Sequence, residues 1–164
     1  MTSLTRYYVK LDEALTTWMA AHGILLLRVS LGIVFTWFGV LKFFPGMSPA
    51  QSLAADTISV LTFGLLSPET TVLILAAWET LIGLGLISGF FLRGTLFLLW
   101  TQMLGTLTPL VIFPELCFKS VPFVPTLEGQ YIIKNIVLIS AGLVIGATAA
   151  GGKLVASTGE ASGE

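Results

Sequence analysis

The sequence predicts an all-α integral membrane protein: a four-helix bundle with an N-terminal amphipathic helix and a short interfacial or re-entrant helix between spans 1 and 2. Of the 164 residues, 55% are hydrophobic and 10% are charged, whereas a water-soluble domain is about one quarter charged. The chain also contains four apolar runs of about 20 residues, the length that a helix needs to cross a bilayer.

The four runs comprise residues 23–41, 70–91, 95–113 and 131–150. They are continuously apolar rather than alternating, which favours helices over the strands of a barrel. Ser67, Pro68 and Glu69 supply a capping residue, a first-turn proline and an acidic group for the start of the second helix. The short turn 92–94 makes the second and third helices antiparallel neighbours. Pro109 is expected to kink or end the third helix.

The polar segments complete the predicted organisation. Residues 1–22 are expected to form an amphipathic helix on the membrane surface, because Tyr8, Leu11 and Leu15 recur at helical spacing. Residues 23–150 form the four-span domain, and the small, polar tail 151–164 is predicted to be disordered.

Two connecting segments carry their own signals. Segment 44–66 is too short and too polar to span comfortably, so we expect an interfacial or re-entrant helix there. Segment 114–129 holds three prolines and is predicted to be irregular.

Lysine and arginine residues outside the spans predict the orientation of the chain. With a cytoplasmic N-terminus, four cations lie inside and two outside: Arg6, Lys10, Arg93 and Lys153 against Lys42 and Lys119. An even number of spans puts both termini on one side, which we expect to be the cytoplasm.

Composition also excludes several classes of function. A net charge of −1 and scattered basic residues argue against nucleic acid as a partner. The single cysteine, Cys117, excludes an intrachain disulfide, and one histidine, His22, with one cysteine cannot complete a metal site. Known hydrolase and nucleotide-binding motifs are missing from the sequence. This favours a protein with no intrinsic catalytic activity and no intrinsic cofactor or metal.

Three ionisable residues lie inside the apolar runs: Arg28, Glu79 and Lys134. Such groups cost about 2.5 to 3.5 kcal/mol at the centre of a spanning helix, so they are expected to face the bundle interior. We predict that Arg28 or Lys134, or both, hold Glu79. The functional interpretation is a polar pocket that binds a small molecule or relays protons, and the structural one is an ion pair that fixes helix register.

Other residues are predicted to join this buried polar cluster or to pack the helices. Lys42, Gln102 and Asn135 are the further polar candidates. Glycines at helical spacing are expected to let helices approach closely: Gly32, Gly39, Gly85, Gly89, Gly142 and Gly146.

These residues resemble a known family. Leu27-Arg28 through Gly39-x-x-Lys42, then Glu79 before a glycine-rich half-helix, then Ile133-Lys134-Asn135, are similar to the DoxX-like superfamily. The segments LRVSLGIVFTWFGVLKFFPG and PTLEGQYIIKNIVLIS are nearest to the branch of inner-membrane proteins that includes the reactive-chlorine-resistance membrane protein.

The resemblance implies a compact four-helix protein of the cell inner membrane. Members are linked to quinone-coupled thiosulfate oxidation, to membrane complexes that handle thiol and oxidative stress, and in eukaryotes to cargo export or receptor assembly. Because that range is wide, the family alone does not fix an activity.

Three functions stay open, in this order. The first is a non-catalytic subunit or stress-related membrane component that binds a membrane or peripheral partner protein. The second is a quinone-linked redox subunit, which would receive electrons from its partner. The third is a small transporter, for which the chain would form a homo-oligomer.

Overall fold

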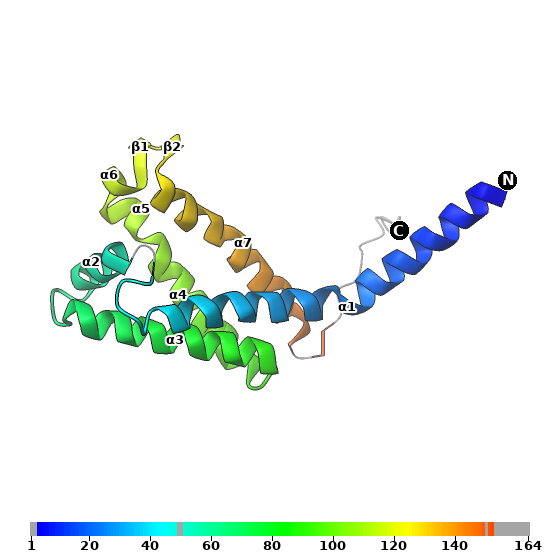
Figure 1. Ribbon diagram of the computed structural model, residues 1–164, viewed down its shortest axis with the longest axis horizontal. Helices are drawn as coiled ribbons and strands as arrows, with labels where there is room; N and C mark the ends of the chain where they lie inside the picture. Colours follow the sequence, from blue (N-terminus) through cyan, green and yellow to red (C-terminus); the bar gives the residue numbers. More distant parts are fainter. Residues whose placement is uncertain (1–2, 49–50, 150, 153–164) are drawn as a thin grey trace, which may run out of the picture.

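The computed structural model describes residues 3–48, 51–149 and 151–152, and most of them are helical (Figure 1). The helices are α1 (Ser3–Leu41), α2 (Gln51–Leu61), α3 (Pro68–Ser88), α4 (Leu92–Leu107), α5 (Pro109–Ile112), α6 (Pro114–Cys117) and α7 (Leu127–Thr148). Within the described residues, four helical stretches are long and apolar enough to cross a membrane: Tyr7–Leu41, Pro68–Ser88, Leu92–Ile112 and Leu127–Thr148. The predicted all-α membrane bundle is confirmed.

The N-terminal segment differs from a separate surface helix. Helix α1 runs unbroken from Ser3 to Leu41, and its first part projects away from the other helices (Figure 1). Residues 7–23 are all exposed. The amphipathic segment and the first span are therefore parts of one helix, while the surface location of residues 1–22 stays a prediction, and residues 1–2 lie outside the described chain.

The start of α3 follows the sequence signals closely. The Ser67 side chain accepts a hydrogen bond from the Thr70 nitrogen at 3.3 Å, and Pro68 occupies the first turn. The other end departs from the predicted turn at 92–94. Gly89 adopts a left-handed conformation with φ of 72° and ends α3, so the turn comes three residues earlier and α4 begins at Leu92.

Proline placement shapes the next connection. Helix α4 ends at Leu107, and Pro109 opens the short helix α5, which extends the third span to Ile112. The segment predicted to be irregular is instead ordered. It contains α6 and an antiparallel hairpin of β1 (Phe118–Ser120) and β2 (Val124–Pro125), and Thr126 caps α7 by accepting from the Gly129 nitrogen at 3.1 Å.

Helix α2 fills the segment between the first two spans and packs mainly against α3. Its Leu53 joins a small core with Cys117 and Ile132. A short helix is thus present where one was expected, and its depth in the membrane stays a prediction.

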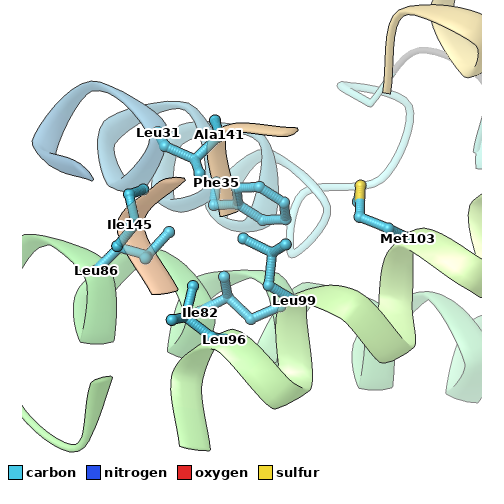
Figure 2. Close-up of a cluster of buried hydrophobic side chains, with 9 residues drawn as sticks. All are labelled: Leu31, Phe35, Ile82, Leu86, Leu96, Leu99, Met103, Ala141 and Ile145. Carbon is cyan, nitrogen blue, oxygen red and sulfur yellow. The ribbon is translucent and has the colours of Figure 1, made fainter. Parts of the chain in front are cut away.

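The main hydrophobic core lies where α1, α3, α4 and α7 meet (Figure 2). Each of these helices contributes buried side chains: Leu31 and Phe35 from α1, Ile82 and Leu86 from α3, Leu96, Leu99 and Met103 from α4, and Ala141 and Ile145 from α7. Most other large apolar side chains are exposed, as expected for helices solvated by lipid. Residues 153–164 of the predicted tail, with Lys153, lie outside the described residues.

Candidate functional site

Three polar side chains meet where α1 ends. The Lys42 ammonium donates to Glu79 Oε2 at 2.5 Å, and the Gln102 amide donates to Glu79 Oε1 at 2.7 Å. The Lys42 and Glu79 side chains are only 13% and 12% exposed, and Gln102 is 8% exposed. We call these three residues the polar cluster.

A close approach of α1 and α3 brings Lys42 to Glu79. A Cβ atom built at Gly39 would lie 2.7 Å from both the nitrogen and Oγ1 of Thr80, so only glycine permits this approach. Lys42 follows Gly39 by three residues, and Glu79 precedes Thr80 directly. The helix contact therefore places the cation beside the carboxylate.

Helix α4 brings the third member. The Trp78 indole donates to the Leu98 carbonyl oxygen at 3.1 Å. Trp78 directly precedes Glu79 on α3, and Leu98 precedes Gln102 by four residues on α4. Since residues four apart lie on one face of a helix, this contact turns Gln102 toward Glu79.

Arg28, a predicted partner of Glu79, lies elsewhere. Helices α1 and α3 run antiparallel, and the Arg28 guanidinium lies against Gly89, at the C-terminal end of α3. Gly89 is ten residues from Glu79, or about 15 Å along the helix. A cation at this end is stabilised by the helix dipole, so Arg28 is better explained as a partner of the α3 terminus.

Lys134, the other predicted partner, is exposed. Its ammonium lies 5.7 Å from the centroid of the Tyr131 ring, in a cation–π contact. The next residue, Asn135, points the other way and donates to Thr106 Oγ1 at 3.3 Å. Lys42 and Gln102 thus replace Arg28 and Lys134 around Glu79, and Asn135 forms a separate link between α7 and α4.

The glycines named from the sequence lie at helix contacts. A Cβ at Gly32 would lie 2.9 Å from the Gly83 carbonyl oxygen, and a side chain at Gly85 would collide with Thr95. Gly142 and Gly146 lie against the Trp100 ring. A Cβ built at Gly142 would lie 3.0 Å from the nearest Trp100 ring atom, and one built at Gly146 would lie 3.4 Å from the ring. Gly83, which packs against Thr36, was not among the glycines named from the sequence.

The polar cluster has unused hydrogen-bonding capacity. Gln102 Oε1 is buried and accepts no hydrogen bond from the described residues. The Lys42 ammonium has three N–H groups, but among the described residues it reaches only Glu79 and, at 3.4 Å, the Phe38 carbonyl oxygen. The cluster can therefore accept one hydrogen bond and donate another, which suits a water molecule, a proton relay or a small hydroxyl-bearing or carbonyl-bearing molecule.

The remaining reactive residues do not form a centre. Across the part of the chain that the structure describes, no group of three or more histidine, cysteine or acidic residues can hold a metal ion. His22 stacks on Trp18 and donates to its carbonyl oxygen at 3.0 Å. Cys117 is fully buried, and this burial, followed by the charges of Glu115 and Glu128, raises the pKa of its thiol. A protonated, buried thiol is a poor nucleophile.

Apolar helices of spanning length around an internal ion pair define a multi-pass membrane protein. The chain belongs to the DoxX family, whose model matches residues 23–113. That range includes all three members of the polar cluster. No curated protein and no solved structure matched the chain.

Proposed function

We propose that this DoxX-family chain is a non-catalytic membrane component that binds a partner protein through the projecting part of α1. We call residues 7–22 of α1 the arm. The observation that carries the proposal is the exposure of the whole arm, which includes large apolar side chains.

The arm has two distinct faces. Tyr8, Leu11, Leu15 and Trp18 follow one another at steps of three and four residues and are all exposed. Glu13, Thr17 and Lys10 lie on the opposite half of the helix. An aromatic and aliphatic stripe of this kind is typical of a helix that lays its apolar face in a groove of another protein.

The continuity of α1 supports a protein rather than the lipid surface as the occupant. The helix has no break between the arm and the span, which supports an arm that extends from the bundle over one that lies along the bilayer. A surface location would require a sharp bend, and sharp bends in helices normally need a proline or a similar local cause. The arm contains no proline.

A photo-reactive amino acid at Leu15 tests the proposal in native membranes, with Thr17 as the matched position on the opposite face. We expect a discrete protein adduct from Leu15 and none from Thr17. With the probe kept at position 15, the pair of changes Tyr8→Glu and Leu11→Glu on the same face should abolish it. Adducts to lipid alone would contradict the proposal and favour the interfacial helix.

A second candidate, a quinone-linked redox subunit, is favoured by the free acceptor Gln102 Oε1. A quinone carbonyl would accept from Lys42, and a quinol hydroxyl would donate to Gln102. With one cysteine and one histidine in the chain, electrons would come from a partner. A quinone analogue should raise the melting temperature of the parent but not of Gln102→Leu, and equal shifts would contradict this candidate. We also propose, with the partner-binding function, that the protein lies in the inner membrane, that both termini are cytoplasmic and that it has a role in oxidative stress.

A further inference from the structure

Helix α1 ends beside the middle of α3 (Figure 1). Gly39 packs on Thr80, whereas α3 begins at Pro68. Eleven residues of α3, or about 16 Å, therefore extend past the end of α1. If α3 crosses the bilayer, the chain leaves α1 within the hydrocarbon layer and not at its surface.

The turn after α1 is irregular and exposed. Residues 43–47 have no helical or strand structure, and all five are exposed. Phe44 and Met47 donate their backbone N–H groups to Leu41 and Phe44, both at 3.2 Å. The carbonyl oxygens of Phe43 and Pro45 accept no hydrogen bond from another described residue.

Lipid cannot satisfy such a turn. Irregular backbone at membrane depth is tolerated only where protein covers it or where it lines a water-filled cavity. The described part of the chain leaves residues 43–47 uncovered. Lys42 does not make the surface polar, because its ammonium turns inward to Glu79.

An unused donor lies next to these unused acceptors. Trp37 is 66% exposed, and its indole N–H has no hydrogen-bond partner among the described residues. It lies four residues before Leu41, the last residue of α1, and therefore about one helical turn from the start of the irregular segment. A shallow apolar groove beside Trp37 is lined by Ile33, Thr36, Val40, Leu41 and Ile87.

We infer that a second copy of this chain covers this surface, which we call the Trp37–Met47 face. A two-fold contact requires a patch that complements itself. Here each copy offers the Trp37 indole as donor, the turn carbonyls as acceptors and a groove that can receive an aromatic ring. In the dimer each indole donates to the turn of the other copy. This contact is separate from the arm.

Cysteine cross-linking in native membranes tests the inference. The parent for these variants carries Cys117→Ser, which removes the only thiol and retains a donor for the Pro109 carbonyl. Phe44→Cys should give a band of twice the chain mass with a short bifunctional thiol reagent. Phe97→Cys on α4, where Phe97 is 67% exposed against 53% for Phe44, is the control and should not.

A second variant tests the hydrogen bond itself. Trp37→Phe keeps the ring and removes the donor, so the dimer should dissociate about tenfold more readily in detergent, as expected for losing a pair of ordinary hydrogen bonds. Unchanged melting of the isolated subunit would show that the variant still folds.

Three outcomes would overturn the inference. Equal dimer bands from Phe44→Cys and Phe97→Cys would indicate random collision. An adduct of Phe44→Cys with a different protein would assign the face to another partner. Labelling of Phe44→Cys by a membrane-impermeant maleimide without dimer formation would identify a water-filled vestibule instead.

Discussion

Gly39 packs so tightly against Thr80 that a single methyl group at position 39 would lie 2.7 Å from the Thr80 nitrogen. The same contact brings Lys42 and Glu79 together across α1 and α3. Helix packing and the pairing of charges therefore depend on the same few atoms.

Gly39→Ala should destabilise the protein in detergent by about 1–3 kcal/mol, because α1 and α3 must separate to admit the Cβ. Gly105→Ala is the control, since a Cβ at Gly105 meets no atom within 4 Å. It should be neutral or stabilising by about 0.5–1 kcal/mol, the usual gain of alanine over glycine in a helix. Thermal melting of both variants checks this prediction, and equal losses would contradict it.

Glu79→Gln should lower the melting temperature, because it leaves the Lys42 ammonium without its counter-charge in a low-dielectric site. Breaking a buried pair from one side costs about 3–5 kcal/mol in soluble proteins. Adding Lys42→Met should restore part of the loss.

Arg28→Gln is the control for that double change. It should show no coupling with Glu79→Gln, because Arg28 lies against Gly89 at the C-terminal end of α3, ten residues from Glu79. Coupling to Arg28 and none to Lys42 would refute the observed pairing.

Cys117 should resist maleimide in the folded protein at neutral pH and react after unfolding. Burial raises the pKa of its thiol above that of the unfolded chain, so the corresponding stability is complete below the unfolded value. It declines as the pH rises above about 8.5, the ordinary thiol pKa, and through the folded value. Melting temperatures at several pH values, compared with those of Cys117→Ser, measure this decline. An identical pH profile for both proteins would count against it.

Orientation must be tested with introduced thiols, since the native thiol is buried. In a Cys117→Ser parent, Lys119→Cys in the exposed hairpin should react with an impermeant maleimide in intact cells. Thr17→Cys in the arm should react only after the membrane is opened. The reverse pattern would place the termini outside.

The sequence predicts the spans well because length and apolarity are local properties. The cap at Ser67 and the break at Pro109 are local too, and the structure contains both. Gly89 ended α3 earlier than the apolar run suggested, since that run continues through Phe90 and Phe91 while the backbone already turns.

The partners of Glu79 cannot be predicted from local properties of the sequence, because they come from other helices. Pairing Glu79 with Arg28 or Lys134 assumes that all four spanning helices are centred at the same depth in the bilayer. The offset between α1 and α3 comes from glycine contacts between distant segments, chiefly Gly32, Gly39 and Gly83. The sequence makes Lys42 a candidate for the buried polar cluster but also, because it follows an apolar run, one of the outer cations, and this offset brings its ammonium to Glu79. When Lys42 is no longer counted among the outer cations, the excess of inner cations that predicts a cytoplasmic N-terminus becomes larger.

The early end of α1 also bears on how the protein is assembled during synthesis. Lys42 is made 37 residues before Glu79, so the first helix enters the bilayer with a cation at its end and no carboxylate to neutralise it. Until α3 arrives, that ammonium is best solvated at the membrane surface, which its flexible side chain can reach. The insertion of α3 then draws the lysine inward, and the first two long helices become stable in the membrane as a pair.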